Sequence, residues 1–142
     1  MKRVAFLFAL WALPAHAFAQ QRDELDATFR AVASQWGRGS AVGVVRHIAP
    51  AGVSIDVSDG PMGPLGGRQA EALLRQLFDQ GETTGVQIGM LERVGGRPPR
   101  AFGAITWILR PEGTLVPVRR TVYFGLEWNE GAWRVAEIRL IP

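Results

Sequence analysis

The chain has 142 residues, with 16 basic residues, 13 acidic residues and no cysteine. Because Lys2 and Arg3 lie in an N-terminal segment that we expect to be removed, 14 of the 16 basic residues remain to balance the 13 acidic ones. A nearly neutral domain does not favour nucleic acid or an anionic membrane as a partner. The lack of cysteine excludes disulfides, thiol catalysis and thiolate metal sites.

The first residues have the three regions of a secretory signal peptide. Lys2 and Arg3 are basic, residues 4–13 are apolar but too short to span a bilayer, and residues 15–19, AHAFA, offer two A-x-A cleavage signals. We predict a signal peptide over residues 1–19 and a single domain over 20–142, exported to the periplasm or the extracellular space without a membrane anchor after cleavage. An uncleaved anchor or a buried N-terminal helix is the alternative.

Two helices and a strand are predicted next. Residues 23–36 place Leu25, Phe29 and Trp36 at helical spacing, which predicts an amphipathic helix. Ser40 is a suitable N-cap for a short second helix that ends at about His47, although the valines of this segment suit a strand equally. Residues 52–57 alternate apolar and polar side chains, as in a short strand.

A glycine- and proline-rich segment separates this strand from the clearest helix. Residues 59–67, DGPMGPLGG, indicate a loop, and no Gly-Lys-Ser/Thr follows that would make it a phosphate-binding loop. Residues 68–80 then predict an amphipathic helix, with apolar residues at positions i, i+3, i+4, i+7 and i+8: Ala70, Leu73, Leu74, Leu77 and Phe78.

The rest of the chain is predicted to be strands. Residues 84–90 alternate, with Val86, Ile88 and Met90 on one face, and residues 101–110 are apolar on both faces, as in a central strand covered on both sides. Residues 116–128 and 133–141 form a long hairpin around the turn 129–131, NEG. We expect its apolar face to pack against the helix over 68–80.

This order of elements predicts one α+β domain, α-α-β-α-β-β-β-β. The chain resembles the nuclear-transport-factor-2-like superfamily, which includes ketosteroid isomerase, and more narrowly a group of short exported bacterial domains of unknown function. The residues that carry the resemblance are 69–74, Leu77-Phe78, 104–109, Val122-Tyr123 and 133–140. The resemblance implies a strongly curved sheet wrapped around three helices, with a pocket at the open end of the cone. It implies no activity, because the fold supports enzymes, dimerisation modules and binding domains.

Candidate catalytic residues are few. His47 is the only histidine after the predicted signal peptide, and Asp56 with Tyr123 would supply the base and the oxyanion donor of an isomerase. By strand alternation, Tyr123 lies on the opposite face from Val122 and Phe124, so it meets Asp56 only if that face lines the cavity. The histidine and the carboxylates have no metal-ligand spacing, and we expect neither a metal nor a cofactor.

Arg120 is the most informative polar residue, because its phase places it between Val118 and Val122 on an otherwise apolar face. If that face is interior, the guanidinium needs a carboxylate partner, for which Glu92 and Glu137 are candidates, or a bound anion. The alternatives are a bulge that turns Arg120 outward and a structural ion pair. Trp107 and Phe124 are large enough to line a ligand pocket with Arg120, although such residues usually form the core.

Two functions follow from these observations. The first is a non-enzymatic exported domain that binds a small apolar or anionic ligand or a protein partner, either in the cone pocket or through the sheet face. The alternative is a lyase- or isomerase-like enzyme that uses Asp56 as base, with Arg120 or Tyr123 stabilising negative charge. Homodimerisation through the sheet is compatible with either function.

Overall fold

The computed structural model describes residues 14–141, and residues 1–13 and 142 lie outside the described part. Most of the predicted signal peptide therefore lies outside it and stays a prediction. Helix α1 (Pro14–Gly37) contains the predicted helix over 23–36, and α2 (Ala41–Val45) is the short second helix. Ser40 caps α2, because its side chain accepts a hydrogen bond from the Gly43 N–H at 3.1 Å.

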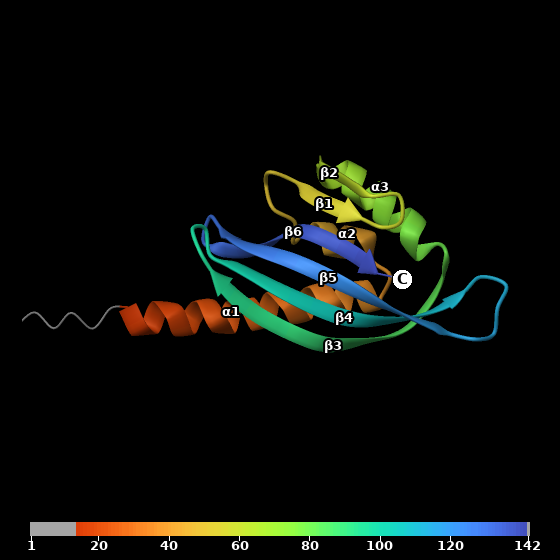
Figure 1. Cartoon of the computed structure of the whole chain (residues 1–142), viewed down its shortest axis with the longest axis horizontal. Helices are drawn as coiled ribbons and strands as arrows, with labels where there is room; N and C mark the ends of the chain where they lie inside the picture. Colours follow the sequence, from red (N-terminus) through yellow and green to blue (C-terminus); the bar gives the residue numbers. More distant parts are fainter. Residues whose placement is uncertain (1–13, 142) are drawn as a thin grey trace, which may run out of the picture.

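The strands form one mixed sheet in the order β2-β1-β6-β5-β4-β3 (Figure 1). Neighbouring strands are antiparallel except β1 and β6, which are parallel. The predicted fold class, a curved sheet around three helices, is confirmed. The remaining bounds are β1 (Val53–Asp56), β2 (Pro61–Leu65), α3 (Gly67–Phe78), β3 (Gly81–Gly95), β4 (Arg100–Pro111), β5 (Val118–Asn129) and β6 (Ala132–Ile141). Within residues 14–141, no helix combines the length and apolar character needed to cross a bilayer.

The prediction of a plain loop over residues 59–67 is wrong, because β2 forms there. It pairs antiparallel with β1, with Ile55 opposite Met62 and Asp56 opposite Pro61. Proline has no N–H to donate to a neighbouring strand, so a strand with Pro61 and Pro64 is tolerated at a sheet edge. β2 holds such an edge position, which explains why a proline-rich segment can still be a strand.

Extra residues in β3 and β6 decide which side chains face the helices. In β6, Ala136 has no partner between the pairs Leu126–Val135 and Gly125–Glu137, and in β3 the register shifts between Ile88 and Met90. Each shift bends the strand and turns the side chains beyond it to the other face. Met90 therefore does not share a face with Ile88, contrary to the sequence prediction.

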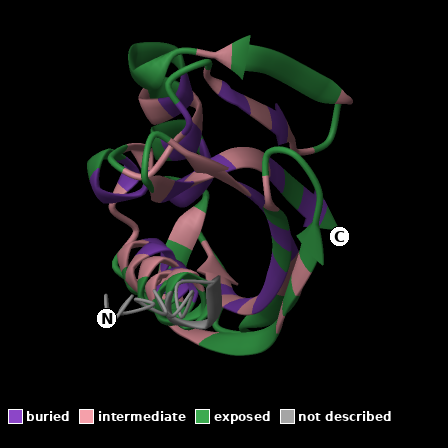
Figure 2. Ribbon diagram, turned by 90° about the vertical axis from the view of Figure 1, so that its left-hand side faces the viewer, coloured by how far each residue is buried: buried purple, intermediate pink, exposed green. Residues whose placement is uncertain are grey.

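The interior of the cone is filled by aromatic rings on the face of the sheet that carries the helices, here called the inner face. Buried residues gather on this side of the curved sheet (Figure 2). Trp36 packs edge to face against Phe78, Trp107 and Phe124, at ring-centroid distances of 5.0, 5.5 and 5.5 Å. Phe29 contacts Phe124 at 5.9 Å. The apolar face of the hairpin is thus covered mainly by α1, rather than by α3 as expected.

Candidate functional site

Arg120 lies on the inner face of β5, opposite Trp107 of β4. The register between the two strands is unbroken from Arg119, opposite Ile108, to Arg120, so no bulge turns Arg120 outward. The residue is half-buried near the start of β5, whereas Arg119 is exposed on the opposite face of the sheet. The sequence prediction of an inward phase for Arg120 therefore agrees with the strand register.

Two adjoining hollows, of about 360 and 210 Å³, meet at Arg120. Both are lined by Val57, Ser58 and Leu140, which bring together the segment after β1 and the end of β6. We call the two together the Arg120 hollow. Helix α3 lines its smaller part with Leu73, Gln76, Leu77 and, just beyond the helix, Gln80.

The two glutamates expected as partners of Arg120 lie on the outer face of the sheet, opposite the helices. Glu137 follows the extra residue of β6 and pairs with Arg139 at 2.9 Å. Glu92 follows the register shift of β3 and stands opposite Phe102, whose side chain is exposed. Neither candidate glutamate is placed to pair with Arg120, because the irregularities put both of them on the other side of the sheet.

Asp56 and Asp59 lie at the rim of the Arg120 hollow. Asp56 is the last residue of β1 and lines the larger part, while the exposed Asp59 lines the smaller part. Within the described part of the chain, no carboxylate oxygen lies within 4.0 Å of the Arg120 guanidinium. Asp56 and Arg120 thus share a hollow without forming an ion pair.

The other two catalytic candidates lie away from this hollow. Tyr123 is on the outer face of β5, between Ala104 and Arg139 of the neighbouring strands. His47 accepts a hydrogen bond at its backbone oxygen from the Val135 N–H, at 2.7 Å. Val135 precedes Arg139, the β6 neighbour of Asp56, by four positions or roughly 13 Å of strand. Asp56 and Tyr123 are the two strand neighbours of Arg139, so they lie on the same face two strands apart, while His47 lies near the other end of β1. The structure therefore does not bring all three candidates together.

His47 is half-buried between charged neighbours. Burial lowers its pKa below the usual 6.5, and the positive charges of Arg134 and Arg46 lower it further. Among the described residues, the Nε atom of Arg134 is buried and has no hydrogen-bond partner. The His47 ring makes no side-chain hydrogen bond to these residues that would orient it as a catalytic base.

Trp107 and Phe124, the proposed pocket-lining aromatics, are fully buried. Trp107 donates a hydrogen bond from Nε1 to the Thr83 hydroxyl at 2.9 Å, whereas the buried Nε1 atom of Trp36 has no partner among residues 14–141. Neither Trp107 nor Phe124 lines the Arg120 hollow. The space that a deep ligand pocket would occupy in this fold is taken by packed rings.

The outer face of strands β3 to β6 carries exposed apolar side chains. Phe102, Met90, Tyr123 and Ile141 are 41%, 40%, 38% and 41% exposed. The strand register places Met90 and Tyr123 on either side of Ala104. The expectation that the β4 strand is covered on both sides is therefore wrong within residues 14–141. We call this surface the outer apolar face.

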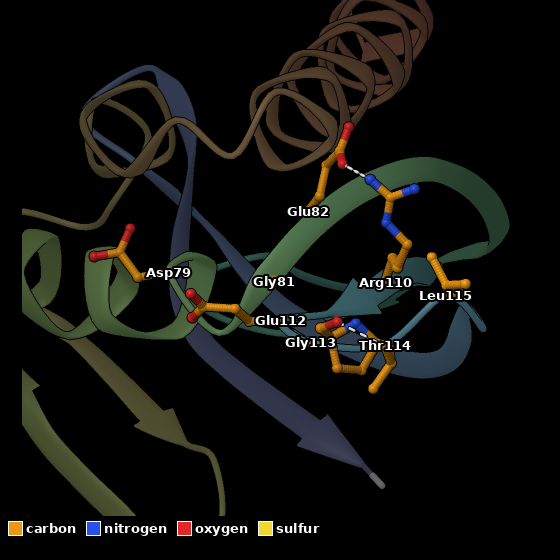
Figure 3. A pocket seen from close by; sticks show the side chains of 9 residues that line it. Asp79, Gly81, Glu82, Arg110, Glu112, Gly113, Thr114 and Leu115 are labelled. Atoms are coloured by element: carbon orange, nitrogen blue, oxygen red, sulfur yellow. Dashed lines mark hydrogen bonds and ion pairs between the residues drawn. The ribbon is translucent and has the colours of Figure 1, made fainter.

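A surface hollow of about 690 Å³ lies where α3 meets β3 and β4 meets β5 (Figure 3). Asp79, Glu82 and Glu112 give it an acidic lining, and Glu82 forms an ion pair with Arg110. The hydroxyl and the backbone N–H of Thr114 both donate hydrogen bonds to the Pro111 oxygen. These two donors stabilise the turn between β4 and β5. Among the described residues, no three His, Asp or Glu side chains gather closely enough to hold a metal ion.

No protein-family model matches the chain, and no curated protein matches it in sequence. Solved structures do match. A DUF4783 family protein from Bacteroides ovatus has 14% sequence identity and a TM-score of 0.64, with 78% of this chain and 90% of that chain covered. A ketosteroid isomerase-like protein from Erwinia carotovora atroseptica has 17% identity and a TM-score of 0.67, with 83% and 92% covered.

A domain of unknown function with a cystatin-like fold from Nostoc punctiforme has 12% identity and a TM-score of 0.64, with 85% of this chain and 76% of that chain covered. At these identities the likeness concerns the fold. The chain has the cone-shaped α+β fold of the nuclear-transport-factor-2-like superfamily, as its resemblance implied. It is similar to several domains of unknown function within that fold group.

Sequence reasoning missed residues of both the Arg120 hollow and the outer apolar face. Ser58, Gln76 and Gln80 belong to no motif. They line the hollow with Arg120 only because β1 and α3 both end near the first residues of β5. The outer apolar face left a clearer signal. The apolar residues on both sides of β4, including Phe102, indicated a surface that something covers.

Proposed function

We propose that the chain is a non-enzymatic, exported binding domain that binds a protein partner through the outer apolar face. The partner to which we commit is a second copy of the chain. The observation that carries this proposal is the exposure of Phe102, Met90 and Tyr123 around the buried Ala104, on the outer face of β3, β4 and β5. A contiguous apolar patch with a polar rim is typical of protein interfaces.

The charges at the rim support pairing with a like surface. Two ion pairs, Arg139–Glu137 and Arg100–Glu127, place both signs of charge on the outer face of β4, β5 and β6. In a two-fold dimer each surface meets its own copy, so a face that carries both signs can place opposite charges across the interface. A strongly basic or acidic face would repel itself.

The lyase- or isomerase-like alternative has less support. One of the similar structures is named ketosteroid isomerase-like, but such chemistry needs a base and an oxyanion donor around one cavity. Asp56 lines the Arg120 hollow, Tyr123 stands two strands from it across Arg139, and His47 lies near the other end of β1. Tyr123 lines neither part of the Arg120 hollow.

Export is proposed from the N-terminal residues. Lys2, Arg3, the apolar residues 4–13 and the cleavage signals over 15–19 support a signal peptide. The absence of cysteine from the sequence is compatible with an oxidising compartment, because no thiol can mispair there. N-terminal sequencing of the chain recovered from the periplasm or medium tests this part, and an intact Met1 would contradict it.

Sedimentation of the chain without residues 1–19, over a range of concentrations, tests the pairing. We expect a dimer for the wild type and a monomer for Phe102→Glu, because a carboxylate at the centre of the interface would be buried without a partner. Val116→Glu is the matched control, since Val116 is 72% exposed in the turn before β5, away from the face. A monomeric wild type, or equal dissociation of both variants, would overturn the proposal.

A further inference from the structure

We propose that the Arg120 hollow binds a small molecule that carries a single anionic group on an apolar body, such as a medium-chain carboxylate. The inference is independent of pairing through the outer apolar face, because Arg120 lies on the inner face of β5. The two proposals can therefore fail separately.

Three carboxylates of the sheet are paired with other arginines. Glu137 pairs with Arg139, Glu127 with Arg100 and Glu82 with Arg110, and neither Asp56 at the hollow nor Glu92 on the outer face forms an ion pair with Arg120. Arg120, half-buried on an otherwise apolar face, has no carboxylate within 4.0 Å among the described residues. A guanidinium in this state keeps its planar set of donors for a carboxylate, which it can bind through two parallel hydrogen bonds.

The lining of the hollow combines apolar and uncharged polar side chains. Leu73, Leu77 and Leu140 supply an apolar wall beside Arg120, while the polar residues Ser58, Gln76 and Gln80 are uncharged. Polar groups form slightly more than half of the lining, so they can fix the orientation of a ligand whose apolar body contacts the leucines. This combination fits an anionic head at Arg120 and an apolar body along the leucines.

The carboxylates at the rim limit the charge of the ligand. Asp56 and Asp59 line the two parts of the hollow and repel any anion that enters. The attraction to Arg120 and the repulsion by the rim carboxylates both double for a dianion, and two carboxylates face one guanidinium, so the added charge brings no net gain. We therefore infer a carboxylate rather than a phosphate monoester.

Titration of the isotopically labelled chain, without residues 1–19, with octanoate tests the site by NMR. We expect saturable shifts of the Ser58 and Leu140 amides, and binding at least about tenfold weaker in Arg120→Gln, since a lost charge pair costs more than 1.4 kcal/mol. Arg119→Gln removes the same charge one residue away on the opposite face and should bind within about twofold of the wild type. Arg120→Lys should retain part of the affinity.

The uncharged octanamide and inorganic phosphate complete the experiment. Both should bind at least about tenfold more weakly than octanoate, the amide because it lacks the charge and phosphate because it lacks the apolar body. The chemical-shift changes of the Ser58 and Leu140 amides in the wild type still test the site if Arg120→Gln does not fold. Undetectable octanoate binding, equal binding by octanamide, tighter binding by phosphate, or equal weakening in Arg119→Gln would each overturn the inference.

Discussion

Trp36 and Trp107 meet edge to face at the centre of the cone, with ring centroids 5.5 Å apart and ring planes at 89°. The two rings are equally buried, but the hydrogen bonding of their indole N–H groups differs. The Trp107 Nε1 donates to the Thr83 hydroxyl, whereas the Trp36 Nε1 has no hydrogen-bond partner among the described residues. This difference separates what ring volume contributes to stability from what hydrogen bonding contributes.

We expect Trp36→Phe to lower the free energy of unfolding less than Trp107→Phe, by about 1 kcal/mol or more. Both substitutions leave a similar cavity, but only the second removes a hydrogen bond, and the first removes an unsatisfied donor. Urea unfolding followed by circular dichroism measures both variants against the wild type. Equal losses, or a larger loss for Trp36→Phe, would contradict this account.

Gly103 leaves space for the ring of Phe29, and a side chain there should destabilise the fold. A Cβ atom at Gly103 would lie 2.5 Å from Cε2 and Cζ of Phe29, so the ring would have to move within a packed core. We expect Gly103→Ala to cost about 1–3 kcal/mol of unfolding free energy, typical of overpacking. Gly85→Ala is the control in β3, because its nearest neighbour, Ile108 Cδ1, lies at an ordinary 3.5 Å. Equal stability of the two variants would count against the tight contact.

The main elements follow from apolar spacing that the sequence displays directly. Leu74, Leu77 and Phe78 are buried on one side of α3, as their spacing predicted. The hairpin of β5 and β6 also forms, although the positive φ angles of its turn fall at Glu130 and Gly131 rather than at Asn129. Such patterns predict secondary structure well because the same spacing of apolar residues repeats along the whole element.

The single-residue irregularities could not be predicted. Ala136 in β6 resembles any other strand residue, yet it reverses the face of Glu137, and the register shift after Ile88 does the same for Glu92. The phase of Arg120 was predictable because β5 has no such shift beside β4. Its neighbours Ser58 and Gln76 were not, since only the tertiary fold brings them close to it.

The stability of the fold should depend on the ionisation of His47. Because the folded state lowers its pKa below the 6.5 of the unfolded chain, unfolding takes up a proton in the range just below that value. The contribution of a neutral His47 is therefore fully present above pH 6.5 and is lost as the pH falls below it towards the folded pKa. We expect urea midpoints to fall over this range in the wild type and to fall less in His47→Gln. Parallel pH profiles would show that His47 is not the group responsible.

Arg120 should contribute little to stability, because it forms no ion pair within the described part of the chain. We expect Arg120→Met to change the free energy of unfolding by no more than about 0.5 kcal/mol, or to increase it, since methionine keeps the apolar stem without the charge. Breaking a buried ion pair would instead cost about 3–5 kcal/mol. Urea unfolding of Arg120→Met, with Arg119→Met as the control on the outer face, distinguishes the two cases. A side chain that the fold does not need, but that octanoate binding requires, would be retained for the ligand, and a loss of several kcal/mol would assign Arg120 to the framework instead.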